Sequence, residues 1–154
     1  MTKTMNFRKA TEKDLAEIVK MMADDVLGKK RENFQSPLPI EYVKAFQKIN
    51  IDKNQELIVL ENENLEVIGT MQLTFIQYIS YVGGIRAQVE NVFIKANQRG
   101  LGMGKKMLEW AIKRAKEKNA HIIQLTSNKE RPRAIKFYEE LGFKSTHEGL
   151  KLYL

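Results

Sequence analysis

In its second half the sequence reads Gln98-Arg99-Gly100-Leu101-Gly102-Met103-Gly104. This glycine-rich stretch joins an apolar segment, Ile85 to Ile94, to a segment from Gly102 to Asn119 whose apolar residues recur at helical spacing. Alternate glycines let a backbone approach a ligand with its N–H groups pointing outward, and a helix N-terminus adds partial positive charge. We therefore predict a turn, between a strand and a helix, that binds a phosphate or pyrophosphate. A tight strand-to-helix connection needing positive φ would explain the same glycines without a ligand.

Two other phosphate-binding patterns do not match this turn. A Walker loop has four residues between its glycines and then Lys-Ser/Thr, whereas Gly100 and Gly104 enclose three residues and Lys105-Lys106 follow. The dinucleotide fingerprint G-x-G-x-x-G belongs to an early βαβ unit, whereas the spacing here is G-x-G-x-G and follows strands that read as antiparallel. The turn is therefore predicted to hold its nucleotide in a different way.

Outward from this turn, the sequence alternates between helix-like and strand-like segments. Helical spacing of apolar residues indicates helices, and short apolar or β-branched runs bounded by turns indicate strands. In chain order, the predicted segments are a strand at Phe7 to Ala10, a helix from Thr11 to near Gly28 that includes Val26, a helix carrying Tyr42, Val43, Phe46 and Ile49, an antiparallel pair at Glu56 to Glu61 and Glu66 to Tyr78, a central strand at Ile85 to Ile94, a helix at Gly102 to Asn119, a short buried strand at Ile122 to Thr126, a helix at Ala134 to Leu141, and β-like sequence from Phe143 to Leu154. This order predicts an α/β fold on one mixed sheet.

Length and composition limit the class of protein. A chain of 154 residues with 43% hydrophobic and 29% charged residues and 3 prolines is expected to fold as a single domain, residues 1–154. It has no run of about 18 apolar residues, and its first ten residues lack the apolar core of a secretion signal, so we expect a soluble protein with no membrane partner. The absence of cysteine excludes disulfides, thiolate metal sites and cysteine nucleophiles, and is compatible with a reducing cytoplasm.

The positive charge is gathered around the glycine turn. The formal net charge is +7, from 26 basic and 19 acidic residues, and favours an anionic partner. Residues 95–118 hold eight basic and two acidic residues, and residues 129–136 add four basic and one acidic. Because no aromatic residues alternate regularly with these, we expect a phosphorylated cofactor and no nucleic acid. Alternatively, the same basic side chains are explained as the solvent-exposed faces of helices.

Two motifs in this order resemble those of the GNAT family, the GCN5-related N-acetyltransferases. Residues Gln98 to Met103 match the family signature Q/R-x-x-G-x-G/A, and Gly104 extends the match. Downstream, Ala134 to Phe143 is similar to the family segment A-x-x-F-Y-x-x-x-G-F. The resemblance implies the GNAT (acyl-CoA N-acyltransferase) fold, a mixed, mostly antiparallel central sheet with flanking helices.

The resemblance also implies an activity and a cofactor. A GNAT enzyme binds acetyl-CoA in an opening between its fourth and fifth strands and transfers the acetyl group directly to a primary amine, here expected to be a small molecule such as an amino acid or polyamine. A protein or peptide N-acetyltransferase and a noncatalytic acyl-CoA sensor are the alternatives. The cofactor contacts that the resemblance implies are Val92, Phe93, Ile94, Arg99, Gly100, Leu101, Gly102, Met103, Gly104, Ala134 and Phe137.

Acetyl transfer to an amine calls for a base and an acid, because the acceptor is an ammonium ion at neutral pH and the departing thiolate benefits from a proton. Glu90 is the candidate base: the family often has a glutamate here, and its apolar neighbours Val89 and Val92 would disfavour the charged carboxylate. Tyr138 is the candidate acid, because the family's tyrosine approaches the sulfur of CoA. A structural or substrate-orienting role for Glu90 and a core-packing role for Tyr138 remain the alternatives.

The acceptor is expected to meet the first half of the chain and the central strands. Acidic groups there could hold an amine and an arginine could hold a carboxylate, although each side chain would equally suit a solvated surface. The candidates are Asp24, Asp25, Arg31, Glu32, Gln72 and Thr74. A homodimer is also possible.

Three further residues are weaker candidates. Asn128 lies near an asparagine frequent in the family, but six residues before Ala134 rather than the family's usual three, so a turn or capping role is at least as good an interpretation. His121 and His147 lack metal-site spacing, and we expect both to be structural and no metal to bind.

Overall fold

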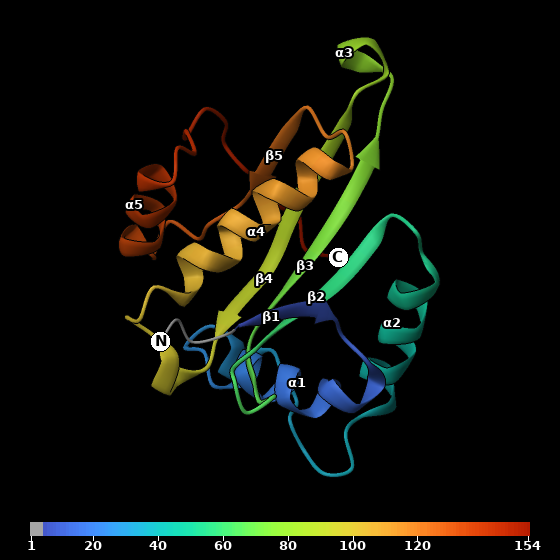
Figure 1. Ribbon diagram of the computed structural model, residues 1–154, viewed down its shortest axis with the longest axis vertical. Coiled ribbons are helices and arrows are strands. Elements are labelled where there is room, and N and C mark those ends of the chain that lie inside the picture. Colours follow the sequence, from blue (N-terminus) through green and yellow to red (C-terminus); the bar gives the residue numbers. More distant parts are fainter. Residues whose placement is uncertain (1–4) are drawn as a thin grey trace.

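A five-stranded sheet runs through the molecule, with its strands side by side in chain order (Figure 1). The structure is a computed structural model that describes residues 5–154. Neighbouring strands pair antiparallel except β4 and β5, which are parallel. The strands are β1 (Asn6–Lys9), β2 (Gln55–Glu61), β3 (Val67–Gln77), β4 (Ile85–Ile94) and β5 (Ile122–Leu125). The predicted mixed, mostly antiparallel sheet with flanking helices is confirmed.

Helices lie on both faces of this sheet. The α-helices are α1 (Leu15–Ala23), α2 (Ile40–Ile51), the short α3 (Ser80–Gly83), α4 (Met103–Glu117) and α5 (Pro132–Glu140), and three 3-10 helices are η1 (Glu12–Asp14), η2 (Gly28–Lys30) and η3 (Ala96–Gln98). Within residues 5–154, no helix has both the length and the apolar character needed to cross a bilayer.

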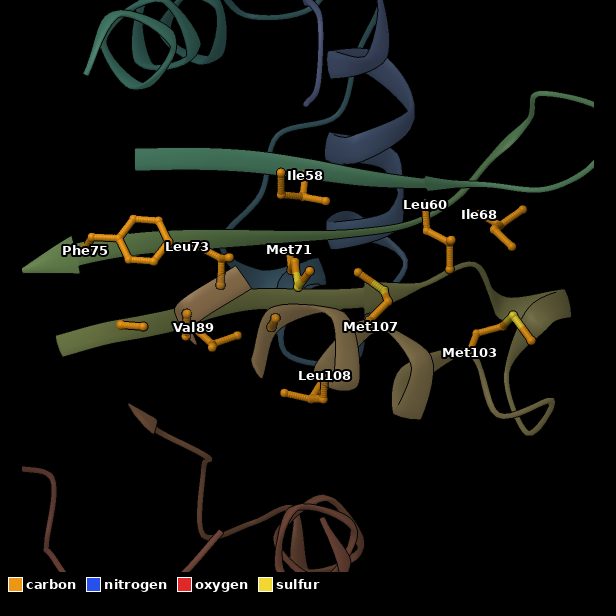
Figure 2. Close-up of a cluster of buried hydrophobic side chains, with 13 residues drawn as sticks. Ile58, Leu60, Ile68, Met71, Leu73, Phe75, Val89, Met103, Met107 and Leu108 are labelled. Carbon is orange, nitrogen blue, oxygen red and sulfur yellow. The ribbon is translucent and has the colours of Figure 1, made fainter. Parts of the chain in front are cut away.

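The core consists of two clusters, one on each face of the sheet, because side chains along a strand point alternately to the two faces. On one face, Met107 and Leu108 of α4 pack against buried strand residues such as Met71 and Val89 (Figure 2). On the other face, α1 and α2 cover a second cluster that includes Phe93. Because successive side chains of a strand point to opposite faces, the central strands are apolar on both sides where helices cover them. The strand predicted at Ile85 to Ile94 is interior, as expected, with β3 and β5 on either side of it. It is not covered on both faces throughout, because Glu90 and Asn91 are exposed.

The parallel pair separates partway along its length. Pairing runs from Arg86 opposite Ile122 to Val89 opposite Leu125, where β5 ends. Residues 90–94 of β4 therefore continue without a strand partner on that side. Asn91 has φ +53° beside a register shift between β3 and β4, which is a β-bulge that bends the strand at this point. Pairing between β4 and β5 thus ends just before the bulge, where the resemblance implies an opening between the fourth and fifth strands.

Some boundaries predicted from the sequence were wrong. The first helix ends at Ala23, and Val26 is 77% exposed instead of continuing the apolar side. The chain turns back so that Gly28 packs on the carbonyl of Met22, where a Cβ would lie 1.7 Å from the oxygen. The last helix begins earlier than predicted, with Pro132 in its first turn, a position where a missing N–H is tolerated.

The two predictions for the end of the chain also need correction. β5 is only half-buried, with Ile122 exposed, because one side of the strand has no neighbour among residues 5–154. Residues 143–154 form no strand, although their sequence is β-like. A strand needs a second backbone to satisfy its hydrogen bonds, and no strand of the described chain pairs with this segment.

Candidate functional site

The glycine turn presents free backbone N–H groups at the start of α4. Gly100 and Gly102 have φ of +75° and +78°, and a Cβ at either position would meet nothing within 4 Å. Glycine is therefore needed at these two positions because of the positive φ, and not because a larger side chain would clash. Among residues 5–154, no protein acceptor meets the N–H groups of residues 100–105. Together with the helix N-terminus, these groups can bind an anion.

Contacts on both sides hold this turn in place. The Arg99 side chain donates from Nε to the Ile94 carbonyl at 3.0 Å, and its backbone N–H donates to Ala96 at 3.3 Å. Arg99 therefore fastens the turn to the end of β4. On the other side, a Cβ on Gly104 would lie 3.4 Å from the ring of Phe137, so α5 packs closely on the start of α4.

The unpaired part of β4 adjoins this turn. Val92 and Ile94 are half-buried with the α4 cluster, whereas Phe93 is buried with the opposite cluster. On the β3 side, Phe93 and Ile94 stay paired with Thr70 and Gly69. The backbone of residues 92–94 is thus held rigidly by one neighbour and left without a strand on the side toward β5. A ligand could add its own hydrogen bonds there, as a further strand would.

Tyr138 lies on α5 among aromatic rings. Its ring is 5.3 Å from that of Phe137 and 6.0 Å from that of Phe143, and it packs against the α4 cluster. Burial raises the pKa of the Tyr138 hydroxyl above its usual value, and the nearby charge of Arg131 lowers it in part. The phenol therefore keeps its proton at neutral pH, which a proton donor requires.

Glu90 lies on the opposite face of the sheet from Tyr138. It is paired with Gln72 on β3, whereas its neighbour Val89 points into the α4 cluster. Glu90 is exposed, so its apolar neighbours in sequence do not bury it as expected. The reason is alternation: Val89 takes the core side of the strand and Glu90 takes the other side. The two catalytic candidates thus lie on opposite faces of the sheet.

The sheet face that carries Glu90 also holds a group of polar side chains. Gln72 donates to Gln55 at 3.0 Å, and Gln124 donates to Gln88 at 2.6 Å. Thr74 is paired with both Gln55 and Gln88, and Gln88 is paired with Gln124. These four residues therefore form one row across β2 to β5. Of these, the sequence predicted Gln72 and Thr74 only. Gln55, Gln88 and Gln124 were missed, because strand register decides which side chains share a face.

The acidic acceptor candidates mostly have partners within the chain. Asp25 is buried, accepts a hydrogen bond from the Leu27 backbone and forms an ion pair with Arg131. This ion pair joins the segment after α1 to the residue before α5. Glu32 accepts hydrogen bonds from Arg31 at 2.9 Å and from the Tyr42 hydroxyl at 3.0 Å. These bonds hold the α1–α2 connection together.

Of the remaining acidic candidates, Asp24 is exposed at the end of α1. The ion pair between Arg131 and Asp25 was not predicted, because nothing in the sequence around Arg131 indicates which side chain it meets.

The weaker candidates have local roles. Asn128 accepts a hydrogen bond from the Glu130 backbone and its carbonyl accepts one from Arg131, which is a turn before α5. His121 contacts the Tyr78 hydroxyl at 2.6 Å, and His147 contacts the Thr146 hydroxyl at 2.7 Å. No group of three or more metal-ligating side chains occurs in the described part of the chain.

A hollow of about 650 Å³ adjoins the glycine turn. Its lining includes Lys106 together with Asn62 and Glu66 of the β2–β3 turn. It also includes Leu101 and Met103, two of the predicted cofactor contacts, but no residue of β4 or α5.

Comparison with known proteins agrees with this geometry. Residues 23–143 match the model of the acetyltransferase (GNAT) family. A crystal structure from Bacillus halodurans, described as a transcriptional regulator, is 51% identical with a TM-score of 0.94, and the match covers 98% of this chain and 100% of that one. A predicted acetyltransferase from Clostridium acetobutylicum, crystallised with acetyl-CoA, is 27% identical with a TM-score of 0.73 and covers 97% and 96%.

Among curated relatives, the aminoalkylphosphonate N-acetyltransferase of Salmonella typhimurium is 27% identical over 84 residues, which is 54% of each chain. This chain spans about half or less of the length of the curated relatives that it matches.

Proposed function

We propose that this chain, which belongs to the acetyltransferase (GNAT) family, transfers the acetyl group of acetyl-CoA directly to a primary amine on a small molecule. One observation carries the proposal: the N–H groups of the glycine turn, which meet no acceptor among residues 5–154, follow directly after the part of β4 that no strand of the described chain pairs on the β5 side. We place the phenol of Tyr138, whose ring packs against the α4 cluster, at the same opening. Because all of these elements belong to one continuous sheet and its helices, we treat residues 1–154 as one catalytic domain.

The residues around the glycine turn fit a diphosphate and a pantetheine arm. The N–H groups of residues 100–105 would bind the phosphates at the start of α4, with Arg99 holding the turn to β4. The backbone of Val92 to Ile94 would bind the amide-bearing arm, and Ala134 and Phe137 of α5 would line the other wall. The Clostridium acetobutylicum structure, which contains acetyl-CoA, supports acetyl-CoA as the cofactor. When bound, this cofactor supplies the acetyl group as a thioester.

The proton transfers are assigned to groups on opposite faces of the sheet. Glu90 would take a proton from the ammonium group, directly or through water, so that the nitrogen lone pair can attack. As the new N–C bond forms and the C–S bond breaks, Tyr138 would donate its phenolic proton to the departing sulfur. The second proton of the acylated nitrogen would pass through solvent to the Tyr138 phenolate, which leaves a neutral amide and a free thiol. Placing base and acid on either side of the opening lets the acceptor enter from the Glu90 face while the thiol leaves toward α5.

A small polar acceptor suits the face that Glu90 shares. Gln72, Thr74 and the Gln88–Gln124 pair offer uncharged donors and acceptors beside it. Asp25 and Glu32 already bond within the chain, so we assign them to shaping the site and not to holding an amine. The name of the Salmonella typhimurium relative, an aminoalkylphosphonate N-acetyltransferase, supports a small amine over a peptide.

The decisive experiment is a screen for thiol release from acetyl-CoA. Purified protein would be tested against amino acids, polyamines, aminoalkylphosphonates and amino sugars, with lysine-containing and N-terminal peptides as a separate group. We expect turnover with a small amine and confirmation of the N-acetylated product by mass spectrometry. Turnover on peptides alone would move the assignment to a protein N-acetyltransferase.

A noncatalytic acyl-CoA sensor is the second candidate. The observation in its favour is the transcriptional regulator from Bacillus halodurans, to which this chain is 51% identical. Calorimetry separates the two functions: tight acetyl-CoA binding without thiol release across the whole amine panel would favour the sensor, whereas turnover excludes it.

A further inference from the structure

The helix that carries Tyr138 is packed only loosely against the rest of the molecule. No residue of α5 is fully buried. Phe137 and Tyr138, with Leu141 just after the helix, lie against the α4 cluster through half-buried apolar contacts. Among residues 5–154, no side chain of α5 itself makes a hydrogen bond or an ion pair. Because apolar contact is not directional, these contacts alone do not fix the helix to the precision that proton transfer needs.

An ion pair holds the start of this helix. Arg131 directly precedes α5, and its carbonyl accepts the backbone N–H groups of Ala134 at 3.0 Å and Ile135 at 3.2 Å. The guanidinium of Arg131 forms an ion pair with the carboxylate of Asp25. The position of Arg131 therefore determines where the first turn of α5 lies, and the ion pair determines the position of Arg131.

Asp25 is an immobile partner for this ion pair. It is 7% exposed, and its Oδ2 accepts a hydrogen bond from the Leu27 backbone at 3.1 Å while Oδ1 accepts from Arg131. Its own backbone N–H donates to the Met22 carbonyl at 3.3 Å, and its carbonyl accepts from Lys29 at 3.0 Å. A charge-assisted hydrogen bond to such a fixed carboxylate is both strong and directional, which the apolar contacts of α5 are not.

The ion pair connects segments that belong to opposite faces of the sheet. Asp25 comes shortly after α1, which packs in the cluster on the face that carries Glu90. Arg131 lies in the connection after β5 and leads into α5, which packs on the α4 face with Tyr138. The pair thus ties the side of the molecule that carries the candidate base to the helix that carries the candidate acid.

We propose that Asp25 and Arg131 are positioning residues for acetyl transfer: their ion pair holds α5 where the phenol of Tyr138 reaches the departing sulfur. Neither residue touches the reacting atoms. This role rests on the proposed function, in which the O–H bond of Tyr138 breaks and its proton passes to the sulfur as the C–S bond breaks. Because a proton passes only between atoms within hydrogen-bond reach, a shift of the helix by about 1 Å is enough to slow this step.

The first test separates the position of α5 from cofactor binding. Asp25→Asn keeps an acceptor for the Leu27 N–H but removes the charge that holds Arg131, so kcat should fall about 10-fold. Acetyl-CoA affinity, measured by calorimetry, should stay nearly unchanged, because the glycine turn and β4 are not altered. Arg131→Gln should lower kcat to a similar extent. The double variant should be no slower than the slower single variant, because both substitutions break the same bond.

Glu148→Gln is the matched control for these variants. It neutralises the ion pair that Glu148 forms at 2.8 Å with Lys129, in the same connection as Arg131, but both of these side chains are more than 70% exposed. An exposed pair contributes little, so this variant should keep the wild-type kcat. Circular dichroism shows whether each variant is folded. A wild-type kcat in Asp25→Asn, or an equal loss in Glu148→Gln, would overturn the proposal while the acetyltransferase activity stands.

A second test follows the helix itself and needs no turnover. The chain has no cysteine, so nitroxide labels can be attached through Lys20→Cys on α1 and Glu139→Cys on α5, both at exposed positions. Pulsed electron paramagnetic resonance should give one narrow distribution of distances between the labels. Asp25→Asn and Arg131→Gln should broaden or shift it, and Glu148→Gln should not.

An unchanged distribution in both variants would refute the role of the ion pair, whether or not any amine is acetylated. Absence of turnover by the wild type across the whole amine panel would instead count against the proposed function, and the distance measurement would still decide whether the pair places α5.

Discussion

At the scale of single residues, Tyr138 combines burial with a hydroxyl that the surrounding rings leave without a protein acceptor among residues 5–154. Burial disfavours the phenolate, so the raised pKa keeps the acidic form present as pH rises past neutrality and loses it only above the usual value of about 10. We therefore expect wild-type kcat to show no loss from this group between pH 7 and 9.

Tyr138→Phe should lower kcat by about 10²-fold or more and leave the affinity for acetyl-CoA nearly unchanged, because the ring still packs and only the proton is lost. Steady-state kinetics and calorimetry measure the two effects. Tyr81→Phe, at an exposed tyrosine in the β3–β4 connection, is the control. Full activity of Tyr138→Phe would mean that water or another group protonates the sulfur.

Glu90 differs from Tyr138 in being exposed on a polar face. Replacing it by Gln keeps its size and its hydrogen-bonding capacity but removes the base, so kcat at neutral pH should fall by about 10² to 10⁴. Steady-state kinetics with the amine found in the screen measure this loss. Glu63→Gln in the exposed β2–β3 turn is the control. An unchanged kcat would reduce Glu90 to a positioning role or none.

At the scale of elements, the junction of β4 and α4 depends on backbone conformation. Gly102 has φ +78° as the N-cap of α4, so Gly102→Ala introduces about 1 to 2 kcal/mol of strain even though space is available for the methyl group. Relaxation of that strain would turn the N–H groups away from the phosphates. We expect acetyl-CoA affinity, measured by calorimetry, to fall about 10-fold.

Gly83→Ala is the matched control for this change, because Gly83 has φ +71° and open space but lies in the distant β3–β4 connection. An equal loss of affinity in both variants would show that general destabilisation, and not the shape of the turn, is responsible.

The same helix is tied to the sheet by a buried carboxylate. Glu56 on β2 is 2% exposed, and Arg114 of α4 bonds both of its oxygens, at 2.9 and 2.6 Å. Burial alone would raise the pKa of Glu56, but the Arg114 bonds and the charges of Arg114 and Lys118 outweigh it and hold the pKa below its usual value. Arg114, one of the basic residues near the predicted cofactor site, thus holds α4 against the sheet.

Glu56→Gln should destabilise the fold by about 2 kcal/mol at pH 7, because Arg114 loses its buried partner and keeps only the exposed Glu117, at 3.0 Å. Urea unfolding measures this loss. Glu109→Gln is the control, since Glu109 is exposed and its Lys105 partner is 3.9 Å away, so its loss should stay within about 0.5 kcal/mol. Equal stability of Glu56→Gln and wild type would contradict a structural role for the pair.

At the scale of the whole molecule, acid should unfold the protein through its ion-paired carboxylates. Arg8 on β1 bonds Asp14 at 2.7 and 2.9 Å and also Glu61 on β2. The Arg8 bonds lower the pKa of Asp14 to about 2 and hold that of Glu61 below its usual value. Because the folded pKa is the lower one, the unfolded chain binds more protons as pH falls. The stabilisation is present above about pH 4 and is lost as pH falls toward 2.

For Asp14 this linkage amounts to roughly 2 kcal/mol at pH 7. Asp14→Asn should therefore be less stable than wild type at neutral pH, and the difference should shrink as pH is lowered from 5 to 2.5. Thermal and urea unfolding across this range measure it. A difference that is constant with pH would mean that the Arg8 pairing does not control acid unfolding.

Much of the fold could be predicted because its signals are local. Helical spacing identified α4 and the core side of α2, and short apolar or β-branched runs bounded by turns identified β2 to β4 within one or two residues, since each pattern depends only on neighbours along the chain. The glycine turn was likewise identified from adjacent residues, and Gly100 and Gly102 do adopt the left-handed conformation that such a turn needs. The assigned roles of Glu90, Tyr138 and the cofactor contacts remain predictions.

The sequence by itself determined the order of elements, the glycine turn and the family motifs, because these depend on short stretches of chain. Only the tertiary structure decided that β5 ends at Leu125 while β4 continues, that Glu90 and Tyr138 lie on opposite faces, and that Gln55, Gln72 and Gln88 share a surface. It also decided that the β-like C-terminal sequence forms no strand within one chain. Register, the choice of face and the presence of a pairing strand are set by distant segments meeting in space, so no local pattern contains them.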